Sequence, residues 1–194
     1  MKQLGGTELK RLHRTWRREN TFRLSLLLEN LQSPFNVGAI VRTAAAMGAE
    51  SLYLTGSTPD VRSAAAQKAA MGSDRFLRTQ RYETVAEGVA QARSDGYHVV
   101  ALELADDAVP LATADLARDI CLVVGHEDRG VSAGCLEACD TVAFVPLLGR
   151  VGSLNVSAAA VVGCYEVRRQ GYAATGLPAA GLVEPADGGL SEAP

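Results

Sequence analysis

Five polar residues of the 194-residue chain lie in or beside predicted strand-to-helix junctions, where binding and catalytic groups are often found. They are Asn36, Arg42, Glu127, Ser153 and Asn155. A guanidinium can hold a phosphate or stabilise developing negative charge, and the other side chains can orient a polar substrate. Each also has a structural explanation, such as helix N-capping for Asn36 and Ser153 or plain solvation for Arg42. One such residue alone therefore leaves the function open.

Arg42 is the most informative of the five. In the helix predicted for residues 37–47, it lies nearly opposite an apolar stripe that includes Val37, Ile40, Ala44 and Met47. Its side chain is therefore expected to point away from the core, toward solvent, a partner or a cleft.

Several common catalytic and cofactor motifs are missing from the sequence. No Gly-x-Gly-x-x-Gly run follows the first predicted strand, and no Gly-x-Ser-x-Gly elbow occurs. The run at 125–132 nearly matches a phosphate-binding P-loop, but Val131 stands where that loop needs its lysine. His13, His98 and His126 are far apart, so no metal site is expected. These observations disfavour the usual dinucleotide enzymes, nucleotide hydrolases and zinc enzymes.

Predicted strands and helices alternate along the chain. Strands are predicted at 23–29, 51–55, 75–79, 97–104, 120–124 and 141–145, and helices at 8–19, 37–47, 61–71, 84–94, 132–138 and 154–167, with a loop and a short helical turn at 105–117. This alternation is typical of an α/β fold with a mainly parallel sheet, which binds ligands outside the carboxyl ends of its strands. The loops 30–36, 125–130 and 146–153 each leave a predicted strand and could meet at that edge. In the last of them, Gly149 and Gly152 permit unusual backbone angles or the close approach of a ligand.

Length and composition suit one domain with a real core. No apolar run approaches the roughly 18 residues of a membrane span, and none follows the basic N-terminus as in a signal peptide. The four cysteines lack Cys-x-x-Cys spacing and are expected to be free thiols in a reducing cytoplasm. From residue 173 the chain is rich in Ala, Gly and Pro without any basic residue, which predicts a disordered tail.

The charge is unevenly distributed. Residues 1–23 carry seven Lys or Arg against two Glu, so the net charge of −3 leaves −8 for the rest of the chain. A basic leading segment on an acidic body suggests contact with a polyanion, although many basic helices are merely solvated. His13 and Trp16 lie among these arginines, and flat rings can stack on bases. The residues expected to bind RNA are Arg11, Arg14, Trp16, Arg17, Arg18 and Arg42.

Three motifs occur in a specific order. They are NVGAIVRTAAAMGA at 36–49, LVVGHEDRGVS at 122–132 and VPLLGRVGSLNVS at 145–157. Together they resemble the SpoU (TrmH-like) family of RNA ribose 2'-O-methyltransferases in the SPOUT superfamily, over about residues 22–170. The resemblance implies a mainly parallel sheet with helices on both faces and a C-terminal trefoil knot. It divides the chain into a basic extension at 1–21, a methyltransferase domain at 22–172 and a tail at 173–194. It also implies a homodimer through the knot region.

The resemblance implies S-adenosylmethionine as cofactor, bound by the second and third motif loops. The expected cofactor-binding residues are Val124, Gly125, His126, Gly130, Val145, Pro146, Leu147, Gly149, Ser153 and Leu154. His126 stands where relatives usually carry a small or amide residue. Its ring could reach the ligand or face solvent, and the second alternative is favoured. Arg42 matches the catalytic arginine of the family. A guanidinium is a poor base, so holding a phosphate and stabilising negative charge is the physically easier role.

The other motif residues would support Arg42. Asn36 would orient the arginine or the ribose, Glu127 would organise the motif loops or the arginine, and Ser153 and Asn155 would hold the site together. The expected function is methylation of a ribose 2'-OH in tRNA or rRNA, with a tRNA guanosine favoured by the third motif. Methylation of a small nucleoside or metabolite, suggested by the acidic body, and a non-catalytic RNA-binding module are the alternatives.

Overall fold

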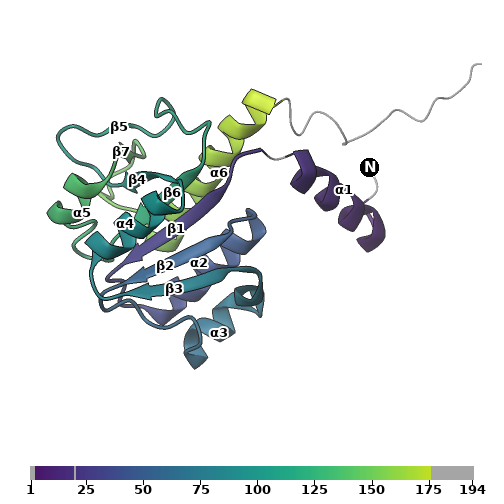
Figure 1. Ribbon diagram of the computed structural model, residues 1–194, viewed down its shortest axis with the longest axis horizontal. Coiled ribbons are helices and arrows are strands. Elements are labelled where there is room, and N and C mark those ends of the chain that lie inside the picture. The colour runs from purple at the N-terminus through teal and green to yellow at the C-terminus, as the bar shows by residue number, and fades with distance from the viewer. Residues whose placement is uncertain (1–2, 20, 176–194) are drawn as a thin grey trace, which may run out of the picture.

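The computed structural model describes residues 3–19 and 21–175. Seven strands form one sheet in which every pairing is parallel, in the order β3-β2-β1-β6-β4-β7-β5 (Figure 1). The strands are β1 (Leu24–Glu29), β2 (Ser51–Thr55), β3 (Arg78–Tyr82), β4 (His98–Leu102), β5 (Val109–Pro110), β6 (Ile120–Val124) and β7 (Thr141–Phe144). The prediction of an α/β fold with a mainly parallel sheet is confirmed.

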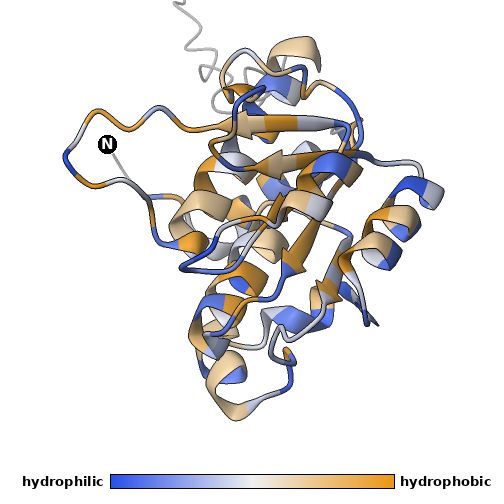
Figure 2. Ribbon diagram, turned by 90° about the vertical axis from the view of Figure 1, so that its left-hand side faces the viewer, coloured by the Kyte–Doolittle hydropathy of each residue, from blue (hydrophilic) through white to orange (hydrophobic). Residues whose placement is uncertain are grey.

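Helices cover both faces of this sheet. Helices α2 (Pro34–Ala46), α3 (Ala64–Ala70) and α6 (Val156–Thr175) pack on one face, and α4 (Val85–Ser94) and α5 (Ala133–Ala138) pack on the other. The central strands β1 and β6 are buried along their length and mostly hydrophobic (Figure 2), as expected for parallel strands with helices on both sides. Successive residues of β1 alternate between the two cores, with Leu26 and Leu28 under α2 and Leu27 under α4. The C-terminal knot stays a prediction.

Helix α1 (Gly6–Glu19) precedes the sheet and has no buried residue. Among the described residues, no helix has the length and apolar character to cross a membrane, and no cluster of His, Cys, Asp or Glu could hold a metal ion. The four cysteines are free. Helix α6 runs eight residues beyond the predicted helix end at 167, so the expected tail begins inside this helix, and residues 176–194 lie outside the described part of the chain.

One predicted strand was misplaced and one short strand was missed. A 3-10 helix, η1 (Ser73–Phe76), occupies the first two residues of the strand predicted at 75–79, and β3 begins only at Arg78. Met71 and Gly72 both adopt left-handed backbone angles, with φ of 52° and 75°, and this turn delays the strand. The short helical turn predicted within 105–117 is present, because Thr113 N–H and Ala114 N–H donate to Pro110 O at 2.9 and 3.1 Å. The strand β5 precedes this turn and was not predicted, and Leu111 N–H donates to Phe144 O at 2.8 Å next to its pairing with β7.

The glycine of the first motif has a packing role. A Cβ atom at Gly38 would lie 2.2 Å from the carbonyl oxygen of Ala66, so only glycine lets α2 and α3 approach this closely. This contact fixes α2, whose N-terminus carries Asn36 and whose third turn carries Arg42, against the rest of the fold.

Candidate functional site

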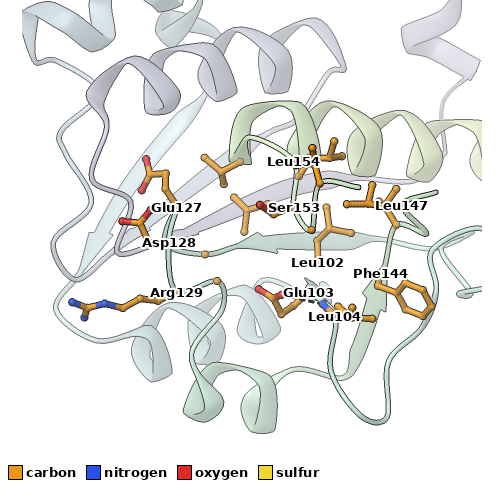
Figure 3. Close-up of a pocket in the computed structure, with 18 of the residues that line it drawn as sticks. Leu102, Glu103, Leu104, Glu127, Asp128, Arg129, Phe144, Leu147, Ser153 and Leu154 are labelled. Atoms are coloured by element: carbon orange, nitrogen blue, oxygen red, sulfur yellow. Dashed lines mark hydrogen bonds between the residues drawn. The ribbon is translucent and has the colours of Figure 1, made fainter. Parts of the chain in front are cut away.

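A cavity of about 760 Å³ opens at the carboxyl ends of β4, β6 and β7 (Figure 3). The residues expected to bind the cofactor all line it: Val124, Gly125, His126, Gly130, Val145, Pro146, Leu147, Gly149, Ser153 and Leu154. Figure 3 shows the charged side chains of Glu127, Asp128 and Arg129 on one side and the apolar ones of Phe144, Leu147 and Leu154 on the other. The structure thus brings these ten residues together, and their role in binding stays a prediction.

The cavity wall formed by the end of β4 and the two residues after it was missed by sequence reasoning. Leu102, Glu103 and Leu104 line the cavity, and Glu103 Oε2 accepts a hydrogen bond from Val131 N–H at 2.9 Å. A Cβ atom at Gly130, whose φ is +68°, would lie 2.1 Å from the same oxygen. Glu103 therefore pins the loop at residues 125–131 to the sheet. The sequence did contain a signal for this wall, because the predicted parallel sheet places the carboxyl end of β4 at the same end as those of β6 and β7.

The loop of the second motif is tightly folded. His126 and Gly130 exchange two backbone hydrogen bonds of 3.0 and 2.8 Å, and a Cβ atom at Gly125 would lie 2.3 Å from the backbone of Gly130. Nδ1 of His126 accepts from Asp128 N–H at 3.0 Å, whereas Nε2 is buried without a hydrogen-bond partner. The expectation that this ring faces solvent was therefore wrong. An unpaired buried polar atom costs about 1–3 kcal/mol, which a ligand could recover by supplying a partner.

The glycines of the third motif differ from those of the second. Neither Gly149 nor Gly152 has a positive φ, and a Cβ atom at Gly152 would meet nothing within 4 Å. Unusual backbone geometry therefore does not explain them. Both glycines line the cavity. Of the two reasons considered for glycine at these positions, close approach of a ligand therefore remains.

A hydrogen-bonded network ties the three motif loops together. Glu127 Oε1 accepts from Ser33 N–H and Asn36 Nδ2, both at 2.9 Å, and Oε2 accepts from Gln32 N–H at 2.8 Å. Asn155 Nδ2 donates to Asn36 Oδ1 at 3.1 Å. The loops expected to meet at one edge of the sheet therefore do so, through side chains from all three motifs.

Two predicted helix caps were wrong. Helix α2 begins at Pro34, and its N-cap is Ser33, whose Oγ accepts from Asn36 N–H at 3.4 Å. Asn36 thus lies inside the first turn, and its amide is available to Glu127. Helix α6 is capped by Asn155, whose Oδ1 accepts from Ser157 N–H at 2.9 Å. Ser153 precedes that cap and lines the cavity as an exposed residue.

The pKa of Glu127 is lowered. Partial burial is the largest single influence and would raise it, but the hydrogen bonds from Asn36, Gln32 and Ser33 together outweigh burial. A carboxylate with a lowered pKa in the folded state contributes stability at pH values above its ordinary pKa, near 4.3, and loses that contribution as the pH falls through the lower folded pKa.

Replacing Glu127 with glutamine is therefore expected to lower the free energy of unfolding by about 1 kcal/mol at pH 7. The difference from the unsubstituted chain should shrink toward zero as the pH falls below 4, because both side chains are then uncharged. Urea unfolding at a series of pH values would measure it. The exposed Glu137, substituted in the same way, serves as the control. A difference that stays constant with pH would contradict the assignment.

Arg42 is exposed and does not line the cavity. As expected, its side chain points away from the core, and Nη1 donates to the sulfur of Met71 at 2.8 Å. Asn36 and Asn155 also lie outside the cavity lining and reach it through Glu127. Within one chain, the structure therefore groups four of the five polar residues near the cavity and leaves the arginine apart.

The basic helix α1 lies near the amino end of β1, whereas the first cavity lies at the carboxyl ends of the strands. A second cavity of about 900 Å³ separates α1 from the start of β1 and the C-terminal end of α2, and Arg14, Trp16 and Arg17 line this cavity. Arg11 and Arg18 are exposed elsewhere on the helix. None of these five residues lines the first cavity, because β1 begins near α1 and the first cavity lies where the strands end.

Comparison with known proteins agrees with this architecture. The model of the SpoU rRNA Methylase family matches residues 23–165. The tRNA (guanosine(18)-2'-O)-methyltransferase of Escherichia coli K12 is 33% identical over 147 residues, which are 76% of this chain and 63% of that protein. The 23S rRNA (guanosine-2'-O-)-methyltransferase of Acinetobacter baylyi is 31% identical, over 76% of this chain and 60% of that protein. The chain thus spans less than two thirds of these relatives.

Solved structures show the same fold. The AdoMet-bound rRNA methyltransferase from Sinorhizobium meliloti superposes with a TM-score of 0.71 at 31% identity, covering 76% of this chain and 56% of that one. The TrmH/SpoU tRNA modifying enzyme of A. aeolicus gives a TM-score of 0.71 at 27% identity, covering 88% and 86%. The resemblance seen in the three motifs is confirmed, and the chain belongs to the SpoU rRNA methylase family.

Proposed function

We propose that this chain transfers a methyl group from S-adenosylmethionine to a ribose 2'-OH of tRNA or rRNA, with a guanosine of tRNA favoured. The observation that carries the proposal is the cavity at the carboxyl ends of the strands. Glu127 lines this cavity and accepts a hydrogen bond from Asn36, which in turn accepts one from Asn155. Relatives named as tRNA and rRNA 2'-O-methyltransferases support the choice of substrate.

The cavity suits an adenosyl cofactor. Its volume of about 760 Å³ lies within the 300–1,000 Å³ typical of small-molecule sites. Leu102, Leu147 and Leu154 offer apolar contact, Gly149 and Gly152 leave room for close approach, and His126 Nε2 lacks a partner. When bound, S-adenosylmethionine supplies an electrophilic methyl group on a positively charged sulfur.

The residues of the chain would then position the acceptor. A ribose 2'-OH is a weak acid that must lose its proton as it attacks, and the transfer needs in-line placement of the reacting atoms. Arg42 would hold an RNA phosphate and stabilise the developing negative charge on the ribose oxygen. Glu127 keeps the first motif loop in place, and Asn36 and Asn155 fix the start of α6, next to Ser153 on the cavity wall.

The separation of Arg42 from the cavity of its own chain supports a homodimer. Helix α6 exposes the apolar residues Val161, Val162 and Tyr165, and a second copy packed there would cover them. The arginine of each copy would then complete the site of the other. The proposed substrates imply an enzyme of the cytoplasm.

Mapping of 2'-O-methyl groups in RNA from cells with and without the gene tests the function. Loss of the methyl group at one ribose of tRNA or rRNA is expected, and purified protein with S-adenosylmethionine should restore it on RNA from the deficient cells. Equal methylation of free guanosine would favour a small-nucleoside enzyme instead. Calorimetry that shows no binding of S-adenosylmethionine would favour a non-catalytic RNA-binding module.

A further inference from the structure

A second basic segment lies within the acidic body of the chain. Residues 62–81 carry five basic residues and one acidic residue, Asp74, whereas the whole chain has a net charge of −3. The basic residues are Arg62, Lys68, Arg75, Arg78 and Arg81. All five are exposed, and Arg81 also supports the fold by donating to the carbonyl oxygens of Gly56 and Thr58. The segment consists of α3, η1 and most of the edge strand β3, and Figure 1 labels α3 and β3.

The turn between α3 and η1 exposes large apolar side chains in this segment. Met71 adopts a left-handed φ of 52°, which costs an ordinary side chain roughly 1 kcal/mol or more. The turn leaves Met71 69% exposed and Phe76 64% exposed. The guanidinium of Arg75 lies over the ring of Phe76, 4.8 Å from its centroid. A strained turn that presents an aromatic ring and a cation to solvent calls for an explanation outside the core.

The same turn contacts Arg42. Arg42 Nη1 lies 2.8 Å from Met71 Sδ, and η1 packs against α2, the helix that carries Arg42. Met71 therefore contacts the arginine proposed to hold an RNA phosphate, and Arg75 and Phe76 lie in the element that packs on the same helix. We call Met71, Arg75 and Phe76 the 71–76 platform.

We propose that the 71–76 platform binds an unpaired nucleotide of the RNA next to the methylated one, with its base stacked on Phe76 and its phosphate near Arg75. This inference rests on the proposed function. Stacking on aromatic rings flanked by cations is how proteins hold single-stranded nucleic acid. The five basic residues against one acidic residue favour a polyanion as the occupant. The sulfur of Met71 would hold Arg42 in place until a phosphate replaces it.

Binding of an unmodified tRNA transcript by the full-length chain, measured by fluorescence anisotropy, tests the proposal. Loss of one stacked base typically costs about 1–3 kcal/mol, so Phe76→Ala should weaken RNA binding by about tenfold. Phe76→Trp should retain the affinity, and the Kd for S-adenosylmethionine should change in neither variant. Val109→Ala is the control, because Val109 is an exposed apolar residue on β5, at the opposite edge of the sheet.

The salt dependence separates a phosphate contact from a structural role. Arg75→Gln should reduce the slope of log K against log salt by about one, as expected for one lost phosphate contact. Wild-type RNA affinity in Phe76→Ala, or an unchanged salt slope in Arg75→Gln, would overturn the platform even if the chain methylates RNA. A wild-type chain that binds S-adenosylmethionine but methylates no RNA would refute the proposed function itself.

Discussion

Replacing Arg42 with alanine is expected to lower kcat for RNA methylation by roughly 10²–10³-fold, the usual effect of removing one group that stabilises negative charge in a transition state. The fold should be unaffected, because the side chain is exposed and its contact is with the sulfur of the exposed Met71. The affinity for S-adenosylmethionine should also be unchanged, since Arg42 does not line the cavity. Single-turnover methylation assays and calorimetry would measure the two effects.

Arg118→Ala provides the matched control, because Arg118 is another exposed arginine, pairs with Asp115 on the surface and precedes β6, away from the cavity. Full activity of Arg42→Ala would rule out the role given to this residue. A mixing experiment then asks which cavity the arginine serves. Gly125→Val should distort the loop that lines the cavity, because a Cβ atom there would lie 2.3 Å from the backbone of Gly130. If Arg42 acts across a dimer, co-refolded Arg42→Ala and Gly125→Val chains should regain activity, whereas action within one chain leaves the mixture inactive.

Replacing Arg168 with methionine is expected to lower the free energy of unfolding by about 2–4 kcal/mol, because it leaves several backbone carbonyls without their charged donor. Arg168 is 4% exposed and lies on α6. Its guanidinium donates to Phe22 O and Met47 O at 2.7 Å and to Gly48 O at 2.9 Å. One side chain thus connects α6, the end of α2 and the approach to β1.

For a chain of this size, such a loss should lower Tm by roughly 10 °C. Differential scanning calorimetry would measure it. The neighbouring Arg169 is an unusually close control, because it differs mainly in environment: it is largely exposed and pairs with Glu166 on the surface of α6. Arg169→Met should shift Tm by only about 1–2 °C. Equal shifts in the two variants would show that burial of Arg168 matters less than its charge.

Periodicity and turn chemistry predicted most of the fold. The strands β1, β2 and β6 stand within one residue of their predicted positions, because continuous apolar runs between turn residues leave few alternatives. The meeting of three motif loops also followed from the rule that parallel strands place their carboxyl ends at one edge. The ten residues expected around the cofactor all line one cavity for the same reason.

The details of the site depended on contacts between distant residues. Ser33 and Asn36 are both good N-cap residues, and the choice between them follows from Glu127, which takes the amide of Asn36 across 91 positions of sequence. Glu103 was overlooked because its partner, the Val131 N–H, belongs to a loop 28 residues away. The 71–76 turn was predicted partly as a strand because left-handed angles at methionine have no sequence signal.

The distance between α1 and the first cavity bears on how this protein could change during evolution. A six-residue strand such as β1 spans about 20 Å, and substitutions farther than 7–10 Å apart usually act additively. The leading helix can therefore acquire or lose basic residues, and with them a preference among polyanions, without altering the geometry around Glu127. Helix α1 at the amino ends of the strands and the cavity loops at their carboxyl ends can therefore diverge in sequence at different rates while the sheet stays the same.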